Sequence, residues 1–533
     1  GLGLAAACGA WMIRTSARAT AAAQAPDTQA PGTGKGAPVL WLYALSGFCA
    51  LGYEILWSRQ LTLLLGNSVY AFSLELALIL TGIGLGSLGW RRRLWLGKSA
   101  MAEFGGLQLA LAAAAVWSLL AYRWLGLAAD SPNYLYSPLT GPADFLRMGF
   151  QAAVMILPAS VTMGLLFPAA AAALAPAGGR PEALVGRLYA FNTVGAILGS
   201  LAAGFFGIEA LGTHGCFLAF AALNLVSGLT ALRLEPARDR APNFASAALA
   251  GLAAVSILFL REDPTVRILS RRLVRDLGAF ELMFHRESAA ATVTGIAVGP
   301  RRTLLINGIK TAGKGFEGAL MAAIPNALLE KVESTLVICF GAGSTYRTAS
   351  RLGGEVHAVE LVGAVVEAMP YFWDDALRHL RGPGRAQFIE DGRHRLLRSA
   401  RRYDIIVVDT SPHLYSSGAV NLYTKEFMEL TRSRLTEGGI FTLWLPLEAY
   451  EADYWSILRS MSDTFPFVSV WTAPEFSGIL CLGTNKPLEL DEKTLDRRIR
   501  SRTTLKLVPW LNGKVLRDGF VLGPEEVRRL TAP

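Results

Sequence analysis

Residues 335–360, TLVICFGAGSTYRTASRLGGEVHAVE, decide the fold of this chain. Five consecutive apolar residues, Leu336 to Phe340, are too few to cross a membrane, and they stop at Gly341-Ala342-Gly343. This pattern predicts a buried parallel strand that enters a tight turn. A second short apolar run ends on Glu360, about twenty residues after the first glycine. The stretch therefore predicts the opening βαβ unit of a nucleoside-binding fold.

The glycines at this turn leave room for a ligand. Without a Cβ atom they let the backbone approach closely, and a carboxylate at the tip of the next strand, here Glu360, can accept both hydroxyl protons of a ribose. The third glycine of the dinucleotide fingerprint is absent, because Thr345 and Tyr346 occupy that region. A pyrophosphate at the helix N-terminus is therefore disfavoured.

The composition places part of the chain in lipid. Of the 533 residues 52% are hydrophobic, and the mean hydropathy is +0.36, which is too apolar for an ordinary soluble protein. Apolar stretches of spanning length predict about seven transmembrane helices, at 39–57, 69–89, 104–124, 146–174, 187–210, 215–233 and 244–260. In the second of these stretches, four glycines between Thr81 and Trp90 give the small-residue spacing of closely packed helices.

The charge pattern indicates membrane topology rather than nucleic-acid binding. The net charge of +9 comes with Lys and Arg that cluster beside apolar segments, as in Arg91-Arg92-Arg93. The five cysteines are scattered, without CxxC or a His at ligand spacing, so neither a zinc site nor a disulfide framework is predicted. We divide the chain into an apolar N-terminal remnant with a flexible linker, a transmembrane helical domain, a small β unit and an α/β domain, at 1–38, 39–262, 263–315 and 316–533.

Ionisable side chains are costly in transmembrane helices, and the predicted ones include Glu209 as well as Glu54 and Glu75. They have two interpretations. Either they serve a function, or Glu54 lies near an interface with Arg59 while Glu75 pairs inside the bundle.

After Arg261 the sequence becomes soluble in character. Alternating or β-branched runs, broken by Gly299-Pro300 and Asn307-Gly308, predict a small antiparallel β unit at 280–286, 290–298 and 303–306. Beyond it strands alternate with helices, and the strands are expected at 336–340, 356–360, 386–389, 405–408 and 439–444, followed by two near 467–472 and 478–483. Such alternation implies a parallel or mostly parallel sheet, whose ligands bind at the carboxyl ends of the strands.

Polar residues gather at those predicted strand ends. Gly341 and Gly343 follow the first strand, Glu360 ends the second, Asp391-Gly392 lies just beyond the third, and Asp409 follows the fourth. Glu360 suits a ribose, Asp391 can accept the exocyclic amine of a purine, and Asp409 can act as a general base toward an amine nucleophile. The alternatives are a plain turn at Asp391-Gly392 and a loop cap at Asp409.

A family resemblance covers both halves of the chain. Between Val337 and Trp471 the motifs VICFGAG, HAVEL, FIEDGR, YDIIVVDTS, AVNLYTKEF and LTEGGIFTLW resemble the spermidine synthase (aminopropyltransferase) branch of the S-adenosylmethionine-dependent methyltransferase fold. The membrane half, with GYEILWSR and VGRLYAFNTVGAILGS, is similar to membrane-fused spermidine synthases. The resemblance implies a multi-pass α-helical bundle, then a small β unit and a Rossmann-like α/β domain.

The resemblance also implies a reaction. In this family a primary amine attacks the aminopropyl carbon of decarboxylated S-adenosylmethionine, and methylthioadenosine leaves. By position, Asp409 resembles the base that deprotonates the amine, and the nucleoside would lie on Gly341, Gly343, Ser344, Glu360, Asp391 and Gly392. No tightly bound cofactor is expected, because decarboxylated S-adenosylmethionine, S-adenosylmethionine or methylthioadenosine would be a co-substrate or product.

The amine side departs from the family. Glu317-Gly318-Ala319 stands where soluble members carry Tyr-His-Glu, Asp409-Thr410-Ser411-Pro412 replaces Asp-Ser-Ser-Asp, and Thr311 stands where a Gln is usual. With one acid left to hold a polyamine, affinity for putrescine should be poor. Two other hypotheses therefore stand beside aminopropyl transfer: a catalytically degenerate subunit that helps to assemble a larger membrane complex, and an S-adenosylmethionine-dependent methyltransferase.

Loop charges and chemistry disagree about the side of the membrane. The cluster Arg91–Arg93 with Lys98 predicts a cytoplasmic loop. The N-terminal end, with Arg14, Arg18 and Lys35, and the loop at 233–240 are then also expected in the cytoplasm. With seven crossings the α/β domain would then face outward, whereas S-adenosyl compounds are expected in the cytoplasm. The expected partners are the lipid bilayer of the plasma (inner) membrane, a small amine if the enzyme is active, and other membrane-protein subunits under the assembly hypothesis, but no nucleic acid.

Overall fold

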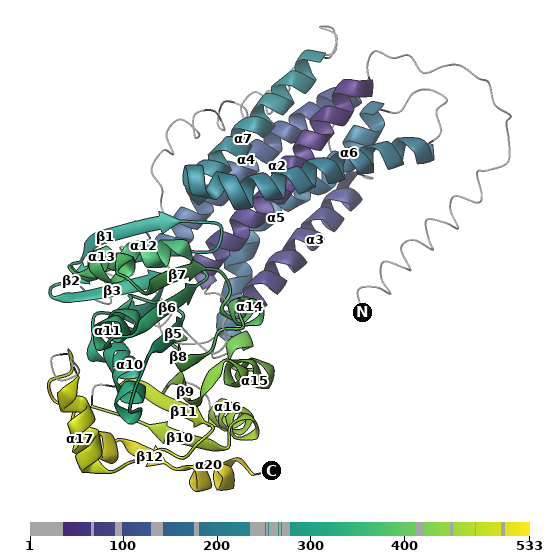
Figure 1. Ribbon diagram of the computed structural model, residues 1–533. Coiled ribbons are helices and arrows are strands. Elements are labelled where there is room, and N and C mark those ends of the chain that lie inside the picture. Colours follow the sequence, from purple (N-terminus) through teal and green to yellow (C-terminus); the bar gives the residue numbers. More distant parts are fainter. Residues whose placement is uncertain are drawn as a thin grey trace.

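This computed structural model defines most of the chain. It describes residues 36–65, 69–90, 99–128, 142–174, 181–234, 278–410, 420–447, 451–474, 476–502 and 507–532, with four isolated positions between 251 and 268. A helical bundle built from the first half of the chain lies beside the sheets of the second half (Figure 1).

Long apolar helices make up the first half: α2 (Gly36–Leu65), α3 (Val69–Trp90), α4 (Ala100–Ala128), α5 (Pro142–Leu174), α6 (Pro181–Leu201), the π-helical turn η1 (Ala202–Gly207) and α7 (Ile208–Leu234). Five described segments are long and apolar enough to cross a membrane. The fifth, Glu182–Leu234, contains two of the predicted spans, at 187–210 and 215–233. The seventh, at 244–260, lies almost entirely outside the described residues. Gly212, whose φ of 71° and ψ of 168° are not helical, separates these two spans, so six of the seven predicted helices lie in the described part of the chain.

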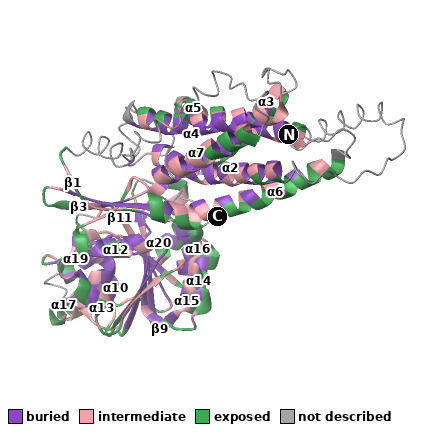
Figure 2. Ribbon diagram, turned by 90° about the horizontal axis from the view of Figure 1, so that it is seen from above, coloured by how far each residue is buried: buried purple, intermediate pink, exposed green. Residues whose placement is uncertain are grey.

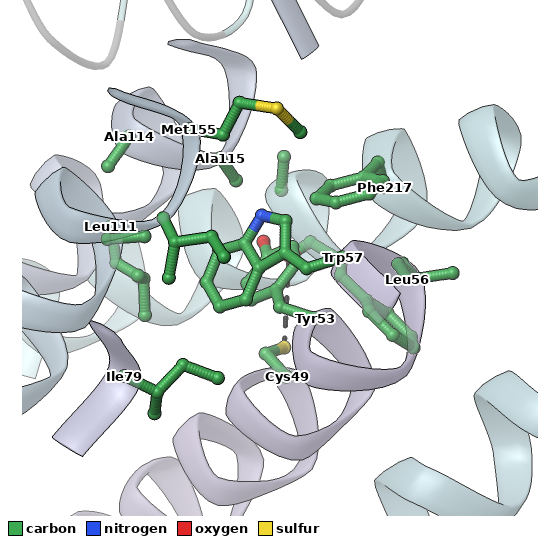
Figure 3. Packing of buried hydrophobic residues seen from close by; sticks show 14 of the residues in the cluster. Cys49, Tyr53, Leu56, Trp57, Ile79, Leu111, Ala114, Ala115, Met155 and Phe217 are labelled. Carbon is green, nitrogen blue, oxygen red and sulfur yellow. Dashed lines mark hydrogen bonds between the residues drawn. The ribbon is translucent and has the colours of Figure 1, made fainter. Parts of the chain in front are cut away.

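Aromatic side chains fill the centre of the bundle. Trp57 and Tyr53 of α2 are fully buried and stack with ring centroids 5.8 Å apart (Figure 3). Each polar tip has a partner, since Trp57 Nε1 donates to Ser118 Oγ at 2.8 Å and the Tyr53 hydroxyl donates to Asn224 Oδ1 at 2.9 Å. These satisfied contacts hold α2 against α4 and α7.

The glycines of α3 allow close packing on α5. A Cβ atom at Gly82 would lie 2.4 Å from Ser160 Cβ, and one at Gly86 would lie 2.1 Å from the carbonyl oxygen of Val161. At Gly84 a Cβ atom would meet nothing within 4 Å. The predicted packing role is therefore confirmed at Gly82 and Gly86 but not at Gly84.

The small β unit is a four-stranded antiparallel sheet in the order β1-β2-β3-β4, with β1 (Glu281–Glu287), β2 (Thr292–Val298), β3 (Arg301–Ile306) and β4 (Ile309–Gly313). Asn307 and Gly308, with φ of 52° and 78°, form the turn between the last two strands, as a two-residue hairpin requires. The sequence predicted three strands. It missed β4 because Ile309–Gly313 is short and carries no run of β-branched residues.

One carboxylate of this sheet caps a helix of the bundle. Gly212 interrupts α7 with φ 71° and ψ 168°, so the helix restarts at Thr213 with unpaired N–H groups. Glu287 Oε2, from the end of β1, accepts from Thr213 N at 2.6 Å and from Thr213 Oγ1 at 2.8 Å. Beside it, the Arg59 guanidinium of α2 donates to the carbonyl oxygens of Ser288 and Ala289. We call these contacts the junction.

We expect Glu287→Gln to weaken the junction. The amide keeps one acceptor but loses the negative charge that suits a helix N-terminus, so the free energy of unfolding should fall by about 1–2 kcal/mol. Thermal unfolding of the full-length protein in detergent, followed by tryptophan fluorescence, measures the change. Glu281→Gln, at the exposed start of the same strand, is the control, and equal destabilisation by both variants would contradict the capping role.

The larger sheet has eight strands in the order β12-β10-β11-β9-β8-β5-β6-β7. Five neighbours, from β9 to β7, are parallel, and three antiparallel strands complete one edge. The mostly parallel prediction is confirmed. The strands are β5 (Ser334–Ile338), β6 (Glu355–Glu360), β7 (Arg385–Ile389), β8 (Tyr403–Val408), β9 (Leu435–Pro446), β10 (Phe467–Trp471), β11 (Gly478–Thr484) and β12 (Phe520–Leu522).

Helices cover both faces of this sheet, and its central strands are buried (Figure 2). Ile405 and Val407 of β8 pack on one face, against α10 (Phe316–Leu328), α17 (Glu492–Ser501) and α19 (Gly513–Asp518), and α11 (Ser344–Leu352), α12 (Gly363–Phe372) and α13 (Ala376–Arg381) pack beside them. Ile406 and Val408 pack on the other face, against α14 (Gly392–Arg398), the short η2 (Val420–Leu422), α15 (Lys425–Ser433), α16 (Glu451–Thr464) and α20 (Pro524–Thr531). This is a three-layer Rossmann-like fold.

Candidate functional site

The strand order reverses between β5 and β8. The chain runs outward from β5 through β6 to β7, then returns to place β8 on the other side of β5. Ile338 pairs with Val408, and Asp409 N donates to Ile338 O at 3.0 Å, so the glycine loop and Asp409 leave the sheet side by side. Ligands of open α/β sheets bind at such a switch point, beyond the carboxyl ends of the strands.

The glycine loop needs its glycines. Gly341 and Gly343 have φ of 53° and 78°, and Gly343 N donates to Phe340 O at 2.9 Å to close the turn. A Cβ atom at Gly343 would also lie 2.9 Å from Met369 Cγ. Cys339 has a φ of 69°, which ends β5 two residues earlier than predicted, because left-handed backbone cannot continue a strand. Ser344 begins α11, and its hydroxyl donates to Gly313 O at 3.3 Å.

Glu360 ties the end of β6 to this loop. Its Oε2 accepts from Phe340 N at 2.8 Å and its Oε1 from Val362 N at 3.0 Å. Burial raises the pKa of the carboxyl group, and the backbone donors oppose that rise. The side chain therefore fixes the shape of the loop, and its role as a ribose ligand stays a prediction.

Asp391 and Gly392 begin α14. Asp391 Oδ1 accepts from His394 N at 2.9 Å and thereby caps the helix. A Cβ atom at Gly392 would lie 2.5 Å from Ile338 Cγ2, so glycine lets the helix start against the end of β5. Asp391-Gly392 thus forms a helix cap instead of the plain turn that was the alternative. The predicted contact of Asp391 with adenine stays a prediction.

Asp409 is the acid best suited to proton transfer. Its Oδ2 accepts from Thr345 Oγ1 at 2.9 Å. Burial, followed by the negative charges of Glu317 and Glu360, raises the pKa of Asp409 to about 7. A carboxylate with a pKa near neutrality is an efficient general base at physiological pH. Ser411 and Pro412, which the loop-cap alternative involves, lie outside the described residues.

The three predicted acids converge. Cys339, at the end of β5, interacts electrostatically with Glu360, Asp409 and Asp391, and after burial these charges raise the pKa of its thiol well above the usual value. Glu360, Asp391 and Asp409, which are far apart in the sequence, thus meet at one edge of the sheet. Thiolate chemistry is disfavoured there, because the anion would be surrounded by carboxylates.

The sequence did not single out Glu317 as a site residue. It lies in the first turn of α10, and its Oε1 accepts from Trp444 Nε1 at 3.1 Å, from Ser477 N at 3.0 Å and from Ser477 Oγ at 2.8 Å. The negative charge of Glu317 contributes to the raised pKa of Asp409. A second missed residue is Tyr423, whose hydroxyl donates to Thr410 Oγ1 beside Asp409. In the sequence, Glu317 was noted only because it stands where soluble family members carry Tyr-His-Glu. Tyr423 was noted only as part of the motif AVNLYTKEF.

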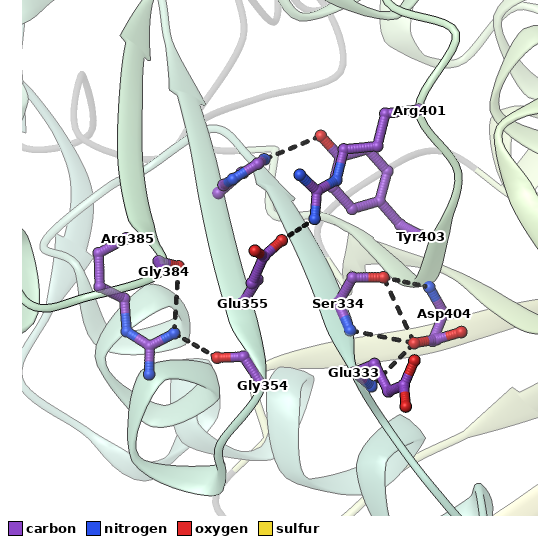
Figure 4. Close-up of polar contacts among 10 residues, drawn as sticks. Glu333, Ser334, Gly354, Glu355, Gly384, Arg385, Arg401, Tyr403 and Asp404 are labelled. Atoms are coloured by element: carbon purple, nitrogen blue, oxygen red, sulfur yellow. Dashed lines mark hydrogen bonds and ion pairs between the residues drawn. The ribbon is translucent and has the colours of Figure 1, made fainter.

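At the opposite edge of the sheet, acidic side chains have ion-pair or hydrogen-bond partners (Figure 4). There Glu355 pairs with Arg401, and Asp404 Oδ2 accepts from Ser334 N at 3.0 Å. Among the residues that the structure describes, Glu317, Glu360 and Asp409 have no ion pair with Lys or Arg. Negative charge is left uncompensated at the carboxyl edge, as a site for a cationic substrate requires.

Comparison with known proteins finds a family match for the part of the chain that forms most of the larger sheet. Residues 316–481 match the family model described as the spermine/spermidine synthase domain. This part of the chain is a spermidine synthase-type domain. The spermidine synthase-type domain begins with α10, which carries Glu317, and extends into β11. It contains every predicted site residue.

Individual relatives match the same region. The chain is 29% identical over 184 residues to a polyamine aminopropyltransferase from Korarchaeum cryptofilum, covering 33% of this chain and 56% of the relative. It is 31% identical over 156 residues to polyamine aminopropyltransferase 2 from Pseudomonas aeruginosa, covering 27% and 44%. The chain thus spans about half the length of these relatives. Spermidine synthase from Thermotoga maritima aligns in three dimensions with a TM-score of 0.40 and 20% identity, over 47% of this chain and 87% of that one.

Proposed function

We propose that the spermidine synthase-type domain transfers an aminopropyl group from decarboxylated S-adenosylmethionine to an amine, on a chain held in a membrane by its apolar helices. The observation that carries the proposal is Asp409, a carboxylate with a pKa of about 7 at the switch point of the sheet. The names of the relatives, polyamine aminopropyltransferases, agree with it.

The proposed chemistry needs one base. The amine nitrogen attacks the aminopropyl carbon, the bond from that carbon to the sulfonium breaks, and its electron pair stays on sulfur, so methylthioadenosine leaves. Asp409 takes the proton that the nitrogen gives up. The acids around it attract the cationic amine and the sulfonium to the same edge of the sheet.

The nucleoside would lie over the glycine loop. In this proposal the nucleoside contacts the backbone of Gly341, Gly343 and Ser344, and Glu360 accepts from the ribose hydroxyls. Asp391 and Gly392, at the start of α14, would contact the purine. The nucleoside is a substrate in this scheme, and no tightly bound cofactor takes part.

Purified full-length protein in detergent micelles tests the proposal. With decarboxylated S-adenosylmethionine and a panel of mono- and diamines, we expect methylthioadenosine to appear in chromatographic assays in proportion to the aminopropylated amine. Labelled S-adenosylmethionine in a parallel reaction tests for methyl transfer. Absence of both products with every amine would contradict a transferase.

We expect Glu317→Gln to shift the pH profile of the reaction. Glu317 raises the pKa of Asp409, so removal of its charge lowers that pKa. Because the base acts in its deprotonated form, the acidic limb of kcat/KM should move to lower pH, by up to about one unit. Glu330→Gln, beyond the far end of α10, is the control. An unchanged profile would mean that the two carboxylates do not interact during turnover.

One observation favours the second candidate, a non-catalytic subunit of a membrane complex. Thr213 contacts the small sheet, whereas Arg233, in the last turn of α7, lies about 30 Å further along the helix. If basic helix ends are cytoplasmic, the sheets lie outside, away from S-adenosyl compounds.

A cysteine introduced at the exposed Lys493 of α17 separates the two candidates. In intact cells, a membrane-impermeant maleimide should label this position only if the domain is outside. Labelling that appears only after permeabilisation supports aminopropyl transfer at the cytoplasmic face of the plasma (inner) membrane, and labelling of intact cells supports the non-catalytic subunit.

A further inference from the structure

The helical bundle buries a carboxylate that the proposed reaction does not use. Glu75 lies two turns into α3 and is the only acidic or basic residue of that helix. Its side chain is 2% exposed. Neither carboxylate oxygen has a hydrogen-bond partner in the part of the chain that the structure describes. A charged carboxylate is unstable in such surroundings, so Glu75 needs a positive charge.

The bundle does not supply that charge. Arg59, the base nearest to this part of α2, donates to the carbonyl oxygens of Ser288 and Ala289 in the junction. No ion pair joins Glu75 to Arg147, the base of α5, among the described residues. The sequence-based interpretation that Glu75 pairs inside the bundle therefore lacks a basic partner among the described residues.

The charged group that faces Glu75 is another acid. Glu54 of α2 interacts with it electrostatically, and Ser58, one turn further along the same face of α2, lies beside it. Further along α3, α5 packs against Gly82 and Gly86 through Ser160 and Gly164. Glu54 is only partly buried, whereas Glu75 is enclosed.

The carboxylates of Glu75 and Glu54 suit a proton better than a metal ion. A metal ion in an oxygen site takes four or more ligands, and no group of three or more His, Cys, Asp or Glu among the described residues could hold one. A proton needs a single carboxylate oxygen, and a neighbouring carboxylate favours its binding by like-charge repulsion.

We propose that Glu75 is a proton-binding site in the bundle, and that the partly buried Glu54 passes the proton to and from it. In each exchange the proton leaves a carboxyl oxygen of Glu54 and binds a carboxylate oxygen of Glu75, or the reverse. Glu54 lies on α2, the helix that also carries Arg59, so the residue that exchanges the proton is within two turns of the junction with the soluble sheets.

Carbodiimide labelling of the full-length protein in lipid nanodiscs tests the proposal. Dicyclohexylcarbodiimide reacts with protonated carboxyl groups in apolar surroundings, and peptide mass spectrometry locates the adduct. We expect an adduct at Glu75 at neutral pH, with a rate that falls about tenfold per pH unit above the midpoint of its titration. Glu54→Gln removes the like charge and should move this midpoint to lower pH.

The controls keep the test decisive. Glu182, exposed in the first turn of α6, should stay unlabelled, since dicyclohexylcarbodiimide modifies carboxyl groups in apolar surroundings. No adduct at Glu75 between pH 6 and 8, or an adduct whose rate does not depend on pH, overturns the proposal. Protection by putrescine beyond that of salt at equal ionic strength would assign the site to an ammonium group instead of a proton.

Discussion

Replacement of Asp409 with asparagine should lower the rate of aminopropyl transfer by about 10²–10⁴-fold, the usual contribution of a positioned general base. The amide can still accept the hydrogen bond that Thr345 donates to Asp409 Oδ2, so the geometry of the site is kept. What is lost is the group that takes the proton of the amine. Methylthioadenosine release under single-turnover conditions measures the loss.

Two measurements accompany this variant. Methylthioadenosine should bind as it does to the unmodified protein, because Asp409 is not placed among the residues of the nucleoside. Asp404→Asn, at the other end of β8, is the matched control, and we expect it to cost stability through its contacts with Ser334 but to leave transfer by the folded protein unchanged. Full activity of Asp409→Asn would remove the central residue of the proposed mechanism.

The second large effect is expected at Glu360. Its two oxygens accept from Phe340 N and Val362 N, and a glutamine can satisfy only one of these donors while its NH₂ group faces the other. Glu360→Gln should lower the free energy of unfolding by about 1–3 kcal/mol. Because the glycine loop and the predicted ribose contact both depend on this carboxylate, nucleoside affinity should fall by at least about tenfold, or 1.4 kcal/mol.

Calorimetric titration with methylthioadenosine and thermal unfolding separate the two roles of Glu360. Glu355→Gln, at the opposite end of the same strand, removes an exposed ion pair with Arg401 and should change neither quantity much. If Glu360→Gln destabilises the protein but binds the nucleoside normally, the carboxylate shapes the loop and does not hold the ribose.

Local patterns predicted most of the larger sheet. The apolar run before Gly341 predicted β5, and the second apolar run, which ends at Glu360, predicted β6. Both strands could be predicted because their signals lie in neighbouring residues. The end of β5 was misplaced, since the left-handed Cys339 carries no sequence signal. β4 escaped prediction for a similar reason, as its residues have no alternating apolar pattern.

The site could be predicted only in part. Acids that directly follow strands, such as Asp409, were found because the carboxyl ends of parallel strands share one edge. Glu317 was not, because its place beside Asp409 depends on how α10 packs across the sheet, 92 residues earlier in the chain. In the bundle, the sequence identified Glu54 and Glu75 as unusual but could not show that Arg59 binds the soluble half.

The contact between Glu287 and Thr213 also has a consequence for biosynthesis. Thr213 leaves the ribosome 74 residues before the side chain that caps its helix. The last described helix of the bundle therefore enters the membrane with an open end and is completed only after the first soluble strand has been translated. A chain released before Glu287 is made would therefore lack the acceptor that closes the start of this helix.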